Sequence, residues 1–155
     1  MIRKVTLFMM LAVLAIGAGT AQAAMVYEAE LLPAHVISGS EATAYGQATL
    51  IIDDGDTDIF LTLNFAGLDS PQVGASLLFA SESEMGTVAM ELPLGSPRAE
   101  VFDATPALVD ALANDGLAIQ VYSEFWPAGA IRGNFVFVTV ATEQTSWTQV
   151  KTLFQ

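Results

Sequence analysis

The chain has 155 residues, of which 53% are hydrophobic, and its 17 acidic residues against five basic ones give a net charge of −12. So few cations cannot neutralise a phosphate backbone, which excludes a nucleic-acid-binding protein. The absence of cysteine excludes disulfides, a thiolate nucleophile and Cys-ligated zinc or iron–sulfur sites. The length is enough for one domain with its own core.

Residues 1–23 have the pattern of a cleaved secretory signal peptide. Arg3 and Lys4 precede an apolar run from Val5 to Ile16, and Ala21–Ala23 fits an A-x-A cleavage site. The run is shorter than the ~20 residues that a membrane-spanning helix needs. We therefore predict a secreted or periplasmic protein with no membrane insertion after cleavage, which takes the net charge from −12 to −14 by removing two cations.

Short strands separated by turn residues follow the signal peptide. Asp58–Phe65 alternates most cleanly between apolar and polar residues, and Asp54-Gly55 before it is a hairpin signal. Such alternation is typical of antiparallel sheets. The first six predicted strands are Met25–Leu32, Thr43–Ile52, Asp58–Phe65, Gly74–Ala80, Gly86–Leu92 and Arg98–Phe102.

One helix is predicted between the strands. Thr105 is a good N-cap, Pro106 suits the first helical position, and Gly116 is predicted to end the helix. Two further strands follow, Leu117–Ser123 and a long Ala130–Ala141, whose two apolar faces predict a central or covered position. This pattern predicts an all-β antiparallel sandwich or barrel with one inserted short helix.

The C-terminal residues 142–155 form a predicted tail with a short helical turn. Ser146–Gln149 fits a capping box, and Trp147, Val150 and Phe154 have helical spacing. The tail either docks on the sandwich and covers an edge strand or serves as a handle for a partner.

Three stretches carry a family pattern. They are the hairpin Ala48–Pro71, the helix and strand Thr105–Ser123, and above all PAGAIRGNF at Pro127–Phe135. The block from Gln47 to Phe135 resembles the CHRD domain, named for its occurrence in chordin, which closes with a similar P-G-G-E-I-R-G-Q pattern. The resemblance implies an immunoglobulin-like sandwich or barrel over residues 24–141, outside the cytoplasm. In animals such domains belong to extracellular antagonists of bone morphogenetic proteins, and in bacteria mostly to small secreted proteins of unknown activity.

The chain departs from the family at its histidines. Ser76 and Leu78 stand where the family carries A-H-I-H-G, Tyr122 stands at a third histidine position, and Ala130 replaces the Glu before I-R-G. A metal or acid–base role of those histidines therefore does not carry over, and we predict no cofactor. His35 is the only histidine, which excludes a site built from several imidazoles. We predict that His35 lies in a surface loop.

Asp54, Asp56 and Asp58 suggest a calcium site. An EF-hand loop counted from Asp54 would need Gly and Glu where Ile59 and Phe65 stand, so this is not an EF-hand. Two interpretations stay open: a looser calcium site, or a solvated hairpin tip whose aspartates serve the turn.

Further binding candidates lie on two predicted strands. Ser76 and Leu78 share one strand face, and Tyr122 shares a face with them if the two strands are neighbours. With Trp126 these residues would form a patch that suits a protein or a sugar ring. The alternative is a second small core, covered by the predicted helix or by the C-terminal tail. Arg132 is expected to pair with a carboxylate, with ligand capture as the alternative.

We therefore predict a secreted, non-catalytic CHRD-like binding or structural module, without catalytic residues, for an unknown protein or glycan partner. For Arg132, Glu124 is the candidate ion-pair partner. Two rival functions are a calcium-dependent adhesion or matrix module and a carboxylate-based hydrolase, which would need two facing acids in a cleft.

Overall fold

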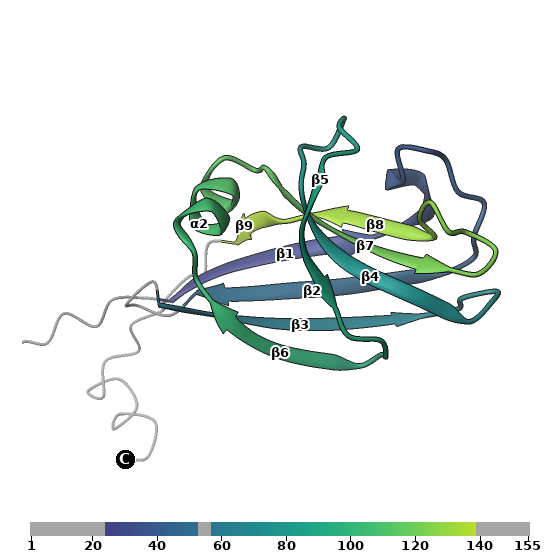
Figure 1. The fold of residues 1–155 in the computed structure, drawn as a ribbon, viewed down its shortest axis with the longest axis horizontal. Helices are drawn as coiled ribbons and strands as arrows, with labels where there is room; N and C mark the ends of the chain where they lie inside the picture. The colour runs from purple at the N-terminus through teal and green to yellow at the C-terminus, as the bar shows by residue number, and fades with distance from the viewer. Residues whose placement is uncertain (1–23, 53–56, 139–155) are drawn as a thin grey trace, which may run out of the picture.

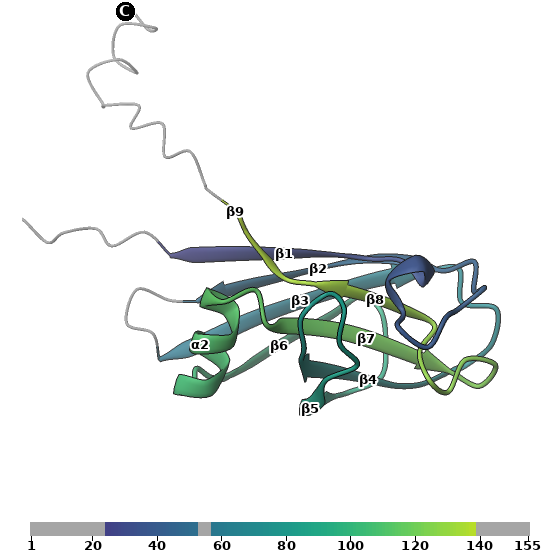
Figure 2. The same cartoon turned by 90° about the horizontal axis from the view of Figure 1, so that it is seen from above.

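Two antiparallel sheets pack face to face in the computed structural model, which describes residues 24–52 and 57–138 (Figures 1 and 2). The five-stranded sheet has the order β6-β3-β2-β1-β9, and the four-stranded sheet has the order β5-β4-β7-β8. The predicted all-β sandwich is confirmed.

The strand bounds agree closely with the prediction up to β7. The five-stranded sheet contains β1 (Met25–Leu31), β2 (Tyr45–Ile52), β3 (Asp58–Ala66), β6 (Arg98–Asp103) and β9 (Val136–Val138). The four-stranded sheet contains β4 (Gln72–Phe79), β5 (Thr87–Leu92), β7 (Leu117–Ser123) and β8 (Ile131–Asn134). A 3₁₀ turn, η1 (Pro33–His35), and one helix, α2 (Pro106–Ala113), complete the described elements.

The core lies between the sheets and follows from the alternation. In the β2–β3 pair, Leu50 lies opposite Leu61 and Ile52 opposite Ile59, and all four side chains are buried. Each strand therefore directs every second residue into one shared core, as a half-buried sheet requires. The antiparallel pairing of β2 with β3 confirms the predicted hairpin.

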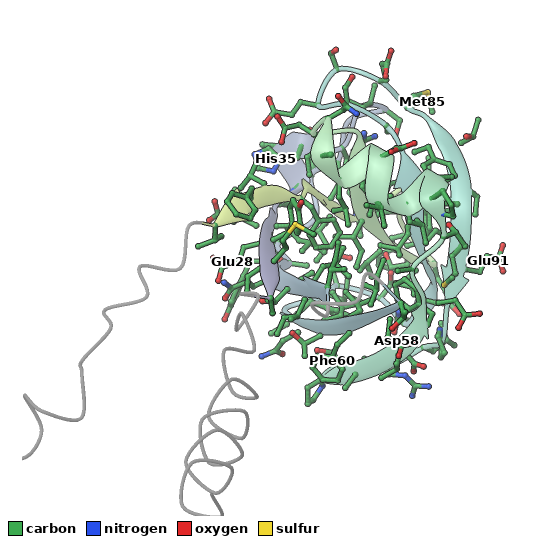
Figure 3. The ribbon with its side chains drawn as sticks, turned by 90° about the vertical axis from the view of Figure 1, so that its left-hand side faces the viewer. Glu28, His35, Asp58, Phe60, Met85 and Glu91 are labelled. Atoms are coloured by element: carbon green, nitrogen blue, oxygen red, sulfur yellow. The ribbon has the colours of Figure 1, made fainter. Side chains whose placement is uncertain are left out.

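Helix α2 closes one end of the sandwich (Figure 3). The Thr105 hydroxyl accepts a hydrogen bond from the Leu108 N–H, as predicted for the N-cap, and Leu108 and Leu112 join the core. The prediction that Gly116 ends the helix needs correction. The helix ends at Ala113, and Asp115 adopts the left-handed conformation, with φ of 53°.

The single long strand predicted over Ala130–Ala141 is wrong. The chain forms β8 in the four-stranded sheet and then β9 in the five-stranded sheet, with the buried Phe135 between them (Figure 2). The apolar run on both faces therefore reflects a change of sheet. The predicted signal peptide, hairpin tip and C-terminal helix fall in residues 1–23, 53–56 and 139–155, outside the described residues.

The two sheets are joined where the end of β1 meets β8. Leu32 and Arg132 exchange backbone hydrogen bonds of 3.0 and 3.2 Å, which link the end of β1 to β8. A side chain at Gly133 would press against the Glu30 carbonyl, so only glycine fits this crossing. Within the described residues, no helix is long and apolar enough to span a membrane.

Candidate functional site

The outer face of the four-stranded sheet brings most of the predicted binding residues together. Strands β4 and β7 are neighbours, as the patch hypothesis required, with Gly74 opposite Tyr122. A polar row crosses the four strands in register and consists of Glu91, Ser76, Gln120 and Arg132. Leu78 lies in the next row, opposite Val88 and Ala118.

A hollow of about 270 Å³ opens on this face, and we call it the outer hollow. Its walls come from three connections: the segment after η1, the loop between β4 and β5, and the turn before β8. Its ten lining residues are Ile37, Ser38, Leu78, Met85, Gly86, Val88, Gln120, Tyr122, Ala128 and Arg132. None of them is acidic, and Arg132 is the one with a permanent charge.

Arg132 is buried, with 1% of its surface exposed. Its Nη2 donates hydrogen bonds to the carbonyl oxygens of Ser81 at 3.0 Å and Glu84 at 2.6 Å. Burial lowers the pKa of the Arg132 guanidinium, and its electrostatic interaction with Tyr122 acts in the opposite direction. The buried Nε has no hydrogen-bond partner among the described residues.

The predicted ion pair between Arg132 and Glu124 is wrong. The guanidinium instead clamps the β4–β5 loop through main-chain oxygens, whose partial charges do not neutralise it. The outer hollow therefore has a positively charged floor in an otherwise acidic chain.

Two further residues that the sequence analysis missed hold the walls of the hollow. Asn134 donates to the Ala80 carbonyl at 2.8 Å and so fixes the start of the β4–β5 loop. Gln120 donates to the Ala128 carbonyl at 2.9 Å and fixes the turn before β8. Strand alternation could have found both, because Asn134 lies two residues from Arg132 and Gln120 two residues from Tyr122.

The loop over the hollow depends on Gly86. Its φ of 72° lies in the left-handed region, and a Cβ at this position would press against the Phe79 carbonyl. Gly86 therefore lets the loop turn back into β5 close to the end of β4.

The alternative interpretation of this face, a second small core, is also partly confirmed. Leu78, Ala80 and Ala118 form a small buried cluster on this face. The predicted helix is not its cover, because Leu108 and Leu112 of α2 pack into the main core instead. The other predicted cover, the C-terminal tail, lies outside the described residues. The β4–β5 loop, held by Arg132 and Asn134, lies beside this cluster.

The remaining patch residues lie at the margin or elsewhere. Ser76 lines an adjoining depression that shares Tyr122 and Val88 with the outer hollow. Trp126 lines neither, and its indole N–H donates to the Asp69 carboxylate at 3.0 Å. The structure therefore brings Leu78, Tyr122 and Arg132 to one hollow and places Trp126 outside it.

The calcium candidates are only partly described. Asp54 and Asp56 fall in residues 53–56, outside the described residues, and Asp58 is exposed opposite Asp103. Among residues 24–52 and 57–138, no three metal-ligating side chains gather at one place. The calcium site stays a prediction.

His35 lies on the surface at the end of η1, as predicted. Its Nδ1 lies 3.2 Å from the Arg132 carbonyl oxygen and 3.3 Å from that of Glu30. The imidazole thus contacts the β1–β8 crossing from outside.

The comparison with protein families shows which family the chain is related to. A model of the CHRD domain matches residues 27–135, from β1 to the residue between β8 and β9. The chain belongs to the CHRD domain family. CHRD domains occur in extracellular proteins and are generally non-enzymatic modules. No curated protein and no solved structure matches the chain.

The geometry explains the I-R-G stretch of this CHRD domain. Ile131 is buried in the core, Arg132 clamps the β4–β5 loop, and Gly133 lets β8 approach β1. Three consecutive residues thus serve the core, the outer hollow and the junction of the two sheets.

Proposed function

We propose that this CHRD domain is an exported, non-catalytic binding module. Its outer hollow would take a small ligand with an apolar body and one anionic end, such as a carboxylate. The observation that carries the proposal is the composition of the hollow: one buried cation and no acidic residue among ten lining residues, in a chain with 17 acidic residues. Export is supported by the signal-peptide pattern of residues 1–23 and by the extracellular occurrence of the family.

The apolar part of the proposed ligand would contact the rim. Met85 and Val88 are 62% and 56% exposed, and Ile37 is 40% exposed on the opposite side. Exposed apolar side chains grouped around a concavity are typical of a binding site. The Tyr122 ring adds an aromatic surface to the floor.

The anionic end would be attracted by Arg132. Because the guanidinium lies away from water, its field is less screened than that of a surface arginine. Its main-chain hydrogen bonds hold it in place, so binding would require little reorganisation of the side chain. The hollow offers a positive charge without a competing carboxylate on its walls.

A non-catalytic role is supported by the same composition. Tyr122 and Arg132 are the titratable side chains that line the hollow. Glycoside hydrolysis uses two facing carboxyl groups, and the hollow is lined by none. The partner predicted from the sequence, a protein or a glycan, stays a prediction.

The test is a titration of the isotope-labelled, exported protein with 3-phenylpropionate, followed by backbone amide chemical shifts. We expect saturable shifts at Val88, Gln120 and Tyr122. Val88→Asp, which places a carboxylate on the rim, should weaken binding several-fold. The matched control is Val136→Asp, because Val136 is an exposed valine on the other sheet and outside the hollow. Equal binding by the two variants, or shifts that map elsewhere, would overturn the proposal.

A further inference from the structure

An apolar row crosses the outer face of the five-stranded sheet, opposite the outer hollow. Its members lie in register from one edge strand to the other, and we call the row the outer stripe. The stripe consists of Val138 on β9, Val26 on β1, Ile51 on β2, Phe60 on β3 and Val101 on β6. Their neighbours in sequence, such as Ile52 and Ile59, point into the core.

The outer stripe is apolar, whereas the adjoining part of this face carries mostly polar side chains. The next row in register is mostly polar and includes Glu28, Thr49 and Thr62. Phe60 is 40% and Val101 is 64% exposed, and Figure 3 shows Phe60 and Glu28 directed away from the core. Solvent-facing positions of an antiparallel sheet are normally polar, so a continuous apolar row indicates a surface that another segment covers.

We propose that the C-terminal residues 139–155 of the same chain cover the outer stripe. The chain leaves the described structure at Val138, which is itself a member of the stripe. The sequence after it supplies Val140, Trp147, Val150, Leu153 and Phe154. Apolar surface of the tail and of the stripe would thus be buried together without any partner.

The length of the tail fits this placement. Adjacent strands lie ~4.8 Å apart, so the distance from β9 to β6 across the sheet is roughly 19 Å. Residues 139–146 can span up to ~26 Å when extended, which brings Trp147 within reach of any strand of the sheet. The helix predicted after Ser146 would add ~12 Å along its axis.

A second copy of the chain is a poorer occupant of the stripe. Pairing two such faces would bring together the Glu28 side chains that flank the stripe in both copies, in molecules with a net charge of −12. Like charges at close range oppose such a contact. The charged side chains of the tail are one acidic and one basic, Glu143 and Lys151, and their charges cancel.

The test uses the absence of native cysteine. Phe60→Cys combined with Val150→Cys in the exported protein should give an intramolecular product with a short bis-maleimide reagent, identified by mass spectrometry of the digest. The matched control pair is Val73→Cys with Val150→Cys, because Val73 is an exposed residue of β4 on the other sheet. We expect a far lower yield from the control pair.

Equal yields from both pairs, no product from the first pair, or a covalent dimer in its place would overturn the inference. A second measurement does not depend on the cysteine positions. Removal of residues 139–155 should increase binding of an apolar dye, and Phe60→Ser in the shortened chain should reverse the increase. An unchanged dye signal after removal would contradict the docking of the tail. Neither experiment depends on the proposed ligand of the outer hollow.

Discussion

The Arg132 guanidinium donates its hydrogen bonds to main-chain oxygens instead of a carboxylate, and this arrangement affects the stability of the fold. Its hydrogen bonds to Ser81 and Glu84 hold a loop that no regular strand pairing holds. Removing the guanidinium would take a charged donor away from the carbonyl groups of Ser81 and Glu84, and hydrogen bonds to charged groups contribute more to stability than neutral ones. Arg132 therefore serves both the fold and the positive charge of the outer hollow.

The replacement Arg132→Met keeps the aliphatic stem and removes the donors. We expect a loss of about 2–4 kcal/mol in the free energy of unfolding, because two hydrogen bonds of a charged donor are removed at a buried site. Urea unfolding followed by circular dichroism measures the loss. The matched control is Arg98→Met, since Arg98 forms a half-exposed ion pair with Glu100 at 2.7 Å, and its loss should cost at most about 1 kcal/mol. Similar losses in both variants would contradict the clamp.

At this scale the sequence predicted positions better than partners. Alternation placed Ser76, Leu78 and Tyr122 on one face correctly, because side-chain direction depends only on the backbone of each strand. The partner of Arg132 was predicted wrongly, because backbone carbonyls are present at every residue and leave no mark in the sequence. The loop that supplies them is fixed by tertiary contacts.

Strand β8 is the element that joins the two sheets. It pairs with β7 in one sheet, and its backbone bonds to Leu32, directly after β1 of the other sheet. Its Gly133 lies against Glu30 of β1. The close approach leaves no room for a side chain at Gly133. The junction therefore depends on glycine for space, and not for an unusual backbone conformation.

The replacement Gly133→Ala tests this junction. The added Cβ would press against the Glu30 main chain, so we expect a cost of about 1–3 kcal/mol, the usual range for overpacking. Thermal and urea unfolding measure it. For comparison, Gly74→Ala places its Cβ at an ordinary contact distance, 3.4 Å from the Tyr122 ring, and should change stability by less than about 1 kcal/mol. A neutral effect of Gly133→Ala would argue against a tight β1–β8 crossing.

Among the elements, the sequence predicted those whose pattern is local. The helix was recognisable because the Thr105 cap and Pro106 are local signals, and β2 and β3 because they alternate. The run from Ala130 to Ala141 was predicted as one strand, because a strand that changes sheets has the same apolar character as a central strand. The run divides into β8 and β9 only because its first part pairs with β7 and its second part pairs with β1 of the other sheet.

At the scale of the whole molecule, the two outer faces of the sandwich differ in chemistry. The face of the four-stranded sheet carries a hollow with a buried cation, and the face of the five-stranded sheet carries an apolar stripe. The chain around them is strongly acidic, which favours solubility and repels anions at long range. An anionic ligand must therefore gain its affinity from short-range contacts inside the hollow.

The most direct test of the account compares two ligands that differ only in charge. Calorimetric titration of the exported protein with 3-phenylpropionate and with its neutral amide, 3-phenylpropanamide, gives a ratio of dissociation constants. A hydrogen bond to a charged group contributes about 1.5–3 kcal/mol, so the carboxylate should bind about tenfold tighter or more. Equal affinities, or tighter binding of the amide, would contradict a ligand site built on the charge of Arg132.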